Sequence, residues 1–154
     1  MDTNIDKKSA IKLKGKSFKI KKRDEALAIR NDFVKFYIDS KLVDLESFCG
    51  LMQYNAMDDS YTYFLGFEIA DNEILDDLDF IDRQIDQSLY LEIFLNEEES
   101  LEDAYRYAYE EFFPNKKYFH NLSSDVEFHQ YDTDNKKIGK SELYVSLMKN
   151  PHIV

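Results

Sequence analysis

Residues 125–131, which read DVEFHQY, hold the side chains of this sequence best suited to chemistry. In a β-strand, alternate side chains point to opposite faces, so Glu127, His129 and Tyr131 share one face. The residues between them, which are mostly apolar, lie on the other face. Burying a carboxylate there is costly unless a cation, a hydrogen-bond donor or a ligand meets it. Ringed by aromatic side chains, it would suit a lipophilic cation, because each cation–π contact adds about 0.5–2 kcal/mol. The alternative is that Glu127 faces solvent, as most glutamates in strands do.

The sequence lacks the signatures of the common catalytic loops. A Gly-rich phosphate loop, a G-x-S-x-G nucleophile turn and an H-E-x-x-H zinc helix are all missing, and the chain has only 4 glycines. A metal centre could be drawn from His120, Glu127 and His129, because two ligands at i and i+2 share a strand face. The third ligand has to be assumed, so we predict neither a metal nor a cofactor.

Charge narrows the possible partners. The formal net charge is −11, whereas binding to a phosphate backbone needs a basic face. Residues 1–23 carry nine Lys and Arg against two Asp, a net +7, which leaves 11 positive and 29 negative residues, or −18, in the remainder. Between Ile11 and Ile20 lysines interleave with apolar residues, which is typical of a half-buried strand or a guarded edge strand. We expect no direct nucleic-acid binding and a small hydrophobic or cationic partner.

The sequence carries few signals for a cellular compartment or for membrane association. The sequence has a single cysteine, Cys49, so an intrachain disulfide is excluded. Cys49 lies in an apolar run, which is typical of a small buried hydrophobic residue. The polar N-terminus shows no apolar core of a signal peptide, and no segment approaches the ~20 apolar residues that span a bilayer. We expect a soluble cytoplasmic protein with no membrane partner.

Two segments of the chain share one pattern. Residues 51–69 and 128–148 each begin with an apolar strand that carries Gln-Tyr, at 53–54 and 130–131, then pass through a polar turn into an aromatic strand. Each segment also follows a strand and an amphipathic helix. The sequence therefore predicts an α+β fold of two strand–helix–strand–strand modules, with a groove between them of the kind that binds small ligands.

Hydrophobic periodicity defines the expected elements and the boundaries of one domain at 10–150. In chain order these are a disordered tail at 1–9, a strand at 10–21, a helix from Asp24 to Ser40, strands at 47–54 and 62–70, an acidic connector at 71–86 that forms a loop or a short helix, a strand at 87–95, a helix from Ser100 to Pro114, and strands near 125–131 and 142–148. Module one spans 10–70 and module two spans 87–149.

Each expected helix has one apolar face. Asp24 is the expected N-cap of the first helix, and Ser100 with Asp103 has the spacing of a capping box for the second. The residues expected to face the core are Ala26, Ile29, Phe33, Phe36 and Tyr37 in the first helix and Leu101, Ala104, Tyr105, Ala108 and Phe112 in the second. In the strand at 62–70, Gly66 marks a bulge or a close backbone approach.

Over roughly residues 10–149 the chain resembles the GyrI-like small-molecule-binding domain, the effector-binding domain of AraC-type and multidrug-sensing transcription activators. The resemblance lies in the duplicated module and in three stretches: YTYFLGFEI at 61–69, the SLEDAY helix that ends in FFP at 112–114, and the strand at 126–132 followed by ELYVSLM. It implies two modules related by pseudo-two-fold symmetry, with a ligand pocket between them and an acidic residue at its base ringed by aromatics.

The resemblance carries over to this sequence in two registers. One makes Glu127 the pocket acid. The other aligns Tyr131 and Asp132 with the family's tyrosine end and puts His129 at the position of the acid. By position, Tyr63, Tyr105 and Tyr144 are the candidates for the aromatic wall. The first copy has no ionisable residue on its Gln-Tyr strand, so we interpret that copy as scaffold.

Three functions remain open. The leading one is a stand-alone binding protein that sequesters or senses a lipophilic molecule; only about ten residues precede the first strand, so we expect no helix-turn-helix. The second is a hydrolase of reactive cyclopropanoid molecules, implied by the resemblance, in which Glu127 activates water and Tyr105 polarises the electrophile. The third is a protein-interaction inhibitor of the gyrase-inhibitor type, with the acidic residues 71–86 on its binding face.

Overall fold

A computed structural model of the chain describes residues 1–69, 75 and 78–152. The helical elements are a 3-10 turn η1 (Arg23–Glu25), α1 (Ala26–Val34), a π-helical turn η2 (Lys35–Asp39), α2 (Leu101–Arg106), a π-helical turn η4 (Tyr107–Phe112) and a 3-10 turn η5 (Phe113–Asn115). The strands are β1 (Asp2–Lys8), β2 (Ile11–Ile20), β3 (Ser47–Asn55), β4 (Ser60–Glu68), β5 (Ile81–Ile85), β6 (Ser88–Phe94), β7 (Tyr118–His120), β8 (Asp125–Asp132) and β9 (Lys137–Lys149). The predicted α+β class is confirmed.

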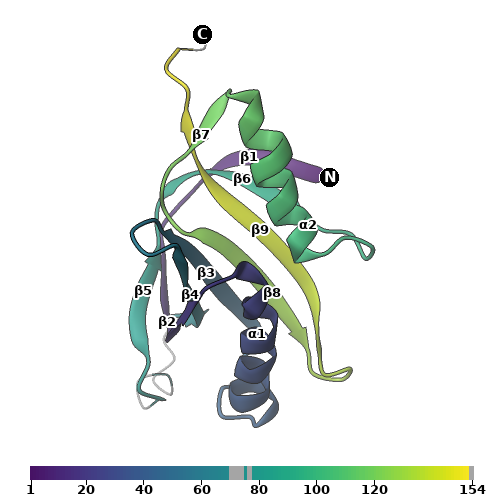
Figure 1. Cartoon of the computed structure of the whole chain (residues 1–154). Coiled ribbons are helices and arrows are strands. Elements are labelled where there is room, and N and C mark those ends of the chain that lie inside the picture. The colour runs from purple at the N-terminus through teal and green to yellow at the C-terminus, as the bar shows by residue number, and fades with distance from the viewer. Residues whose placement is uncertain (70–74, 76–77, 153–154) are drawn as a thin grey trace.

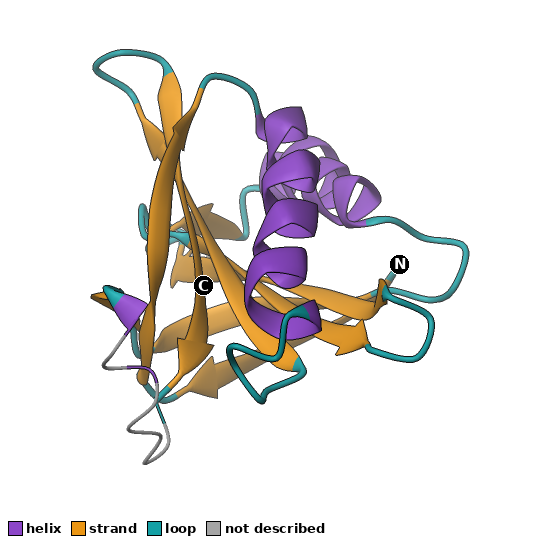
Figure 2. Cartoon of the chain, turned by 90° about the horizontal axis from the view of Figure 1, so that it is seen from below, coloured by secondary structure: helices purple, strands orange, loops and turns teal. Residues whose placement is uncertain are grey.

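The strands form one antiparallel sheet in the order β1-β6-β9-β8-β3-β4-β2-β5, with β7 paired to β9 (Figure 1). Strands β3 and β8 are neighbours at its centre, and the strands on either side correspond: β9 to β4, β6 to β2 and β1 to β5. This order is the predicted duplication, with the pseudo-two-fold axis between β3 and β8. Both helices lie on one face of the curved sheet (Figure 2).

Apolar side chains fill both faces of the sheet. The larger cluster lies between the helices and the sheet and includes Phe33, Tyr63, Leu65, Tyr105 and Leu143. A smaller cluster lies on the opposite face, where the curvature of the sheet encloses it: Leu13, Cys49, Leu51, Phe64, Ile85, Tyr90 and Val126. Cys49 is free and buried, as expected, and burial raises the pKa of its thiol to about 12.

The second helix follows its predicted pattern. Ser100 accepts a hydrogen bond from the backbone N–H of Asp103, and the Asp103 carboxylate accepts one from the backbone N–H of Ser100, which completes the capping box. Ala104, Tyr105 and Ala108 are buried on the predicted face. The site residues on α2 are therefore positioned by a local sequence signal.

The first helix departs from its prediction at both ends. Asp24 is not the N-cap, because the helical segment begins at Arg23 after the extended backbone of Lys22. The carboxylate of Glu25 instead accepts the backbone N–H groups of Lys21 and Lys22, each at 2.7 Å. Phe36 is 63 % exposed rather than buried. The wider π-helical turn brings Ile38 into the core and turns Phe36 outwards.

Two predictions outside the helices are wrong. Residues 2–8 are not a disordered tail: they form β1, which pairs with β6, and Lys8 lies 3.2 Å from the buried carboxylate of Glu92. The acidic connector contains a strand, β5, at its end. Pairing with the Lys-rich β2 explains this, because Lys14 lies 3.4 Å from Asp82. Residues 71–74 and 76–77 of the connector lie outside the described residues.

Gly66 marks a close backbone approach, one of its two predicted roles. It lies directly opposite Gly15 in the β2–β4 pair, and a Cβ at Gly66 would stand 2.6 Å from the carbonyl oxygen of Lys14. Strand β2 lies inside the sheet, between β4 and β5, rather than at its edge.

Within the part of the chain that the structure describes, no helix has the length and apolar character that crossing a membrane requires.

Candidate functional site

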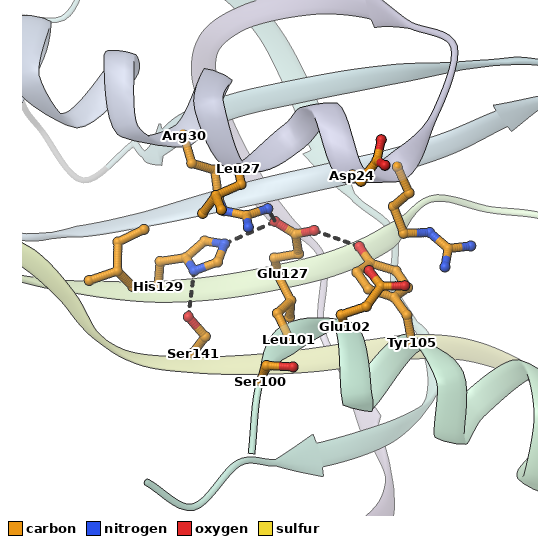
Figure 3. Close-up of a pocket in the computed structure, with 12 residues that line it drawn as sticks. Asp24, Leu27, Arg30, Ser100, Leu101, Glu102, Tyr105, Glu127, His129 and Ser141 are labelled. Carbon is orange, nitrogen blue, oxygen red and sulfur yellow. Dashed lines mark hydrogen bonds and ion pairs between the residues drawn. The ribbon is translucent and has the colours of Figure 1, made fainter. Parts of the chain in front are cut away.

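A cavity of about 390 Å³ lies between the two helices, above the centre of the sheet. One wall is Leu27 and Arg30 from α1, and the other is Leu101 and Tyr105 from α2 (Figure 3). Its floor includes Glu127 from β8. The cavity therefore lies between the two modules, as the duplicated pattern predicts.

The carboxylate of Glu127 is fully buried and is held from both sides. Its Oε1 accepts hydrogen bonds from the Tyr63 hydroxyl at 2.5 Å and from Nε2 of His129 at 2.9 Å. Its Oε2 accepts a hydrogen bond from the Tyr105 hydroxyl at 2.5 Å, and Nη1 of Arg30 lies 3.6 Å from Oε1. These donors come from α1, α2, β4 and β8. Figure 3 shows Arg30, His129 and Tyr105 around the carboxylate.

The donors around Glu127 keep it ionised. Burial by itself raises the pKa of a carboxyl, but the hydrogen bond and charge of His129, the charge of Arg30 and the hydrogen bond of Tyr105 outweigh it. Together they lower the pKa of Glu127 to about 2. The Glu127 side chain is therefore negatively charged at neutral pH.

The hydrogen bonds determine which nitrogen of His129 carries hydrogen. An ionised carboxylate only accepts, so Nε2 must donate to Glu127. The other nitrogen, Nδ1, lies 2.7 Å from the Ser141 hydroxyl, which donates to a neutral ring or accepts from a protonated one. The ring also stacks on Phe48 at 4.8 Å between centroids. His129 is thus fixed in orientation by β9 and by its neighbour on β3.

Arg30 and the two tyrosines complete the electrostatics of the site. Arg30 donates to the Tyr63 hydroxyl at 3.1 Å, and its side chain is 12 % exposed. Burial and the charge of Glu127 raise the pKa of Tyr63 and of Tyr105 well above the usual value, so both hydroxyls keep their protons. The cluster therefore sets the Glu127 carboxylate between the Arg30 guanidinium, the His129 ring and two protonated tyrosine hydroxyls.

A second cavity, of about 650 Å³, adjoins the first and has its own buried carboxylate. Asp125 accepts a hydrogen bond from the Tyr109 hydroxyl at 2.5 Å and lies 3.0 Å from Nε2 of His120. Its other walls include Tyr54 and Tyr61. Arg23 lines both cavities.

Four of the five predicted site residues come together: Glu127, His129, Tyr63 and Tyr105. Glu127 and His129, the alternatives of the two registers, lie side by side in one hydrogen-bonded cluster. Tyr144 does not join them. It lies on the opposite face of the sheet, where its ring contacts Phe128 at 4.7 Å between centroids. The reason is the register of β9 against β8. Tyr144 pairs with Val126, so the two side chains lie on the same face of the sheet, opposite to the face of Glu127.

The structure separates the residues of the conceivable metal centre. His120 lies with Asp125 in the second cavity, away from His129 and Glu127. Across the described ranges, no three residues of the types His, Cys, Asp and Glu are grouped so that they could hold a metal ion.

Two arginines that line the cavity, Arg23 and Arg30, were not predicted from the sequence. A signal for Arg30 was present, because it lies four residues after Ala26 and three before Phe33, on the apolar stripe of its helix. A charged residue on such a stripe needs a buried partner. Arg23 gave no such signal, because its contacts come from η4, α2 and β4, which are remote in sequence.

Comparison with known families finds one that covers nearly the whole chain. The family model described as "Cass2: Integron-associated effector binding protein" matches residues 4–147. Comparison with curated proteins gives no match.

Several solved structures share the fold. SAV2435 bound to tetraphenylphosphonium is similar with a TM-score of 0.66 and 13 % identity, over 96 % of this chain and 94 % of that one. The integron cassette protein VCH_CASS2 from the mobile metagenome of Vibrio cholerae is similar with a TM-score of 0.65 and 12 % identity, over 95 % of each chain. The C-terminal domain of EcmrR is similar with a TM-score of 0.59 and 11 % identity, over 96 % of this chain and 98 % of that one.

Proposed function

The chain belongs to the family of integron-associated effector binding proteins, and we propose that it binds a small hydrophobic cation in the cavity between α1 and α2. Its family and fold fit a small-molecule effector-binding domain. In this proposal the protein sequesters or senses its ligand in the cytoplasm, and Glu127 is the ligand's charge partner.

One observation carries the proposal: an ionised carboxylate forms part of the lining of a largely apolar cavity. Glu127 is fully buried in the protein, yet its pKa is lowered to about 2. Leu27, Leu101 and Ile138 supply apolar surface around it, and Tyr105 supplies a ring. Such a lining favours a ligand that combines apolar bulk with positive charge. The tetraphenylphosphonium bound to SAV2435 is a molecule of this kind.

The chemistry of Glu127 supports binding over hydrolysis. A general base is most effective when its pKa lies near the working pH. With a pKa of about 2, and with both oxygens already accepting hydrogen bonds, Glu127 is a poor base for activating water. Tyr105 is committed to the same carboxylate, so its hydroxyl is not free to polarise an electrophile.

A thermal-shift titration with tetraphenylphosphonium tests the proposal, because a ligand that binds only the folded state raises Tm with concentration. We expect the wild type to be stabilised and Glu127→Gln to be stabilised much less. Glu142→Gln is the matched control, because it removes a strand carboxylate beside Tyr144, outside the cavity. Equal shifts in the wild type and Glu127→Gln, or no shift in any variant, would overturn the proposal.

A further inference from the structure

The guanidinium of Arg23 lies against the rings of three tyrosines. Its central carbon is 4.4 Å from the ring centroid of Tyr105, 5.5 Å from that of Tyr109 and 5.7 Å from that of Tyr61. These distances are within the range at which a cation is attracted to an aromatic face. The three rings together form a cage around one positive charge, which we call the tyrosine cage.

The rings of this cage are electron-rich, because two of their hydroxyls donate to buried carboxylates. Tyr105 donates to Glu127 and Tyr109 donates to Asp125, each at 2.5 Å. A phenol that donates to an anion gains negative charge on its ring, which strengthens its attraction for a cation. Within the described part of the chain, the buried Nε of Arg23 has no hydrogen-bond partner. At that atom the arginine is held by the rings alone.

The tyrosine cage stands where the two cavities of the groove meet. Arg23 and residues of the cage line both: Tyr105 belongs to the first cavity, and Tyr61 and Tyr109 to the second. A molecule that enters either cavity therefore meets the Arg23 side chain.

We propose that the tyrosine cage is a cation subsite of the groove, that Arg23 is its resident cation, and that a cationic ligand binds by displacing the arginine. This inference rests on the proposed function and adds a specificity-determining residue to it. A neutral ligand cannot replace the positive charge of Arg23 in the tyrosine cage. Arg23 then stays in place, and the neutral ligand can occupy one cavity only. Once displaced, the arginine no longer divides the groove, and the ligand gains access to both cavities.

The resident cation lowers the apparent affinity for ligand cations, because the empty cage is populated only part of the time. Arg23→Ala removes this competitor. Given the strength of cation–π contacts at partly exposed sites, we expect it to bind tetraphenylphosphonium about tenfold more tightly than the wild type, by isothermal titration calorimetry.

Two controls separate displacement from a general change of charge. Lys22→Ala removes one positive charge from the exposed neighbour of Arg23, and its effect on affinity should be small and should vanish at high salt. The gain in Arg23→Ala should persist at high salt. The affinity for triphenylphosphine oxide, a neutral probe, should increase much less on Arg23→Ala than the affinity for the phosphonium does.

An NMR measurement on the wild type tests displacement without any substitution. Ring currents of the tyrosine cage should shift the Hδ and Hε resonances of Arg23, and saturating tetraphenylphosphonium should return them towards ordinary arginine values. Phosphonium binding that is equal or weaker in Arg23→Ala, or unchanged Arg23 resonances in the saturated wild type, would overturn the inference. If instead no probe binds to any variant, the proposed function itself fails.

Discussion

Gly50 lies directly opposite Glu127 in the pairing of β3 with β8, and the two residues occupy equivalent positions in the duplicated pattern. Residues 53 and 130 of the repeated Gln-Tyr differ by 77 (130 − 53), and so do residues 50 and 127 (127 − 50). The pseudo-two-fold axis therefore passes between them. A Cβ at Gly50 would stand 2.6 Å from Oε1 of Glu127 and 3.1 Å from the Tyr63 hydroxyl. The glycine of the first copy makes room for the carboxylate of the second.

Gly50→Ala should therefore disturb the site and the stability together. The methyl group must push the carboxylate away from its donors, and overpacking of this kind costs about 1–3 kcal/mol. Gly139→Ala is the matched control, because a Cβ there meets Asp132 at an ordinary 3.6 Å. Urea unfolding should show a lower free energy of unfolding for Gly50→Ala alone. Equal stability of both variants would show that the carboxylate relocates without cost.

The ionised state of Glu127 predicts a loss of stability in acid. Its folded pKa, about 2, lies below the ordinary value of 4.5, so the folded state binds its proton less readily than the unfolded state. The contribution is fully present above about pH 4.5, is lost as pH falls towards 2, and amounts to about 3 kcal/mol. Free energies of unfolding measured by urea from pH 6 down to about 2 should fall more steeply for the wild type than for Glu127→Gln.

Asp58 provides a contrast in the same experiment. Its pKa is also lowered to about 2, by hydrogen bonds from Lys19 and Ser60, but the residue lies at the surface. Asp58→Asn should flatten the acid dependence only at low ionic strength, because salt screens exposed pairs. If salt abolished the effect of Glu127→Gln as well, the carboxylate could not be buried as described.

The tyrosines of the two faces should behave differently. Tyr105→Phe removes a donor from a buried carboxylate, which costs about 1.5–3 kcal/mol and raises the pKa of Glu127, so acid unfolding should begin at a higher pH. Tyr144→Phe removes a hydroxyl that donates to Glu142 at 3.3 Å, on the other face of the sheet. Acid titrations followed by circular dichroism compare the two midpoints. A matching shift in Tyr144→Phe would contradict the assignment of faces.

The N-terminal strand should contribute to stability through one buried partner. Deleting residues 1–9 removes the pairing of β1 with β6 and takes Lys8 away from the carboxylate of Glu92. We expect a lower Tm in thermal melts, with part of the loss restored by Glu92→Gln in the shortened chain, because the neutral amide is cheaper to leave unpaired. A shortened chain as stable as the full one would contradict this role for β1.

The sequence predicted what depends on local spacing. Alternation placed Glu127 and His129 on one face, and the helical period placed Tyr105 on a buried stripe. Spacing within one strand does not say which face another strand presents, and this is why Tyr144 was misplaced. Its register depends on pairing with β8, where the ladder shifts between Gln130 and Tyr131. Strand β1 and the contacts of Arg23 also depend on residues remote in sequence.

A crystal structure of the complex with tetraphenylarsonium would test the central claim most directly, because anomalous scattering locates the arsenic without ambiguity. We predict one arsenic site in the cavity between α1 and α2, on the side of Glu127, with the Tyr105 ring centroid within about 6 Å of the cation. An arsenic site on the opposite face of the sheet beside Tyr144, or no ordered arsenic in crystals grown at saturation, would contradict it.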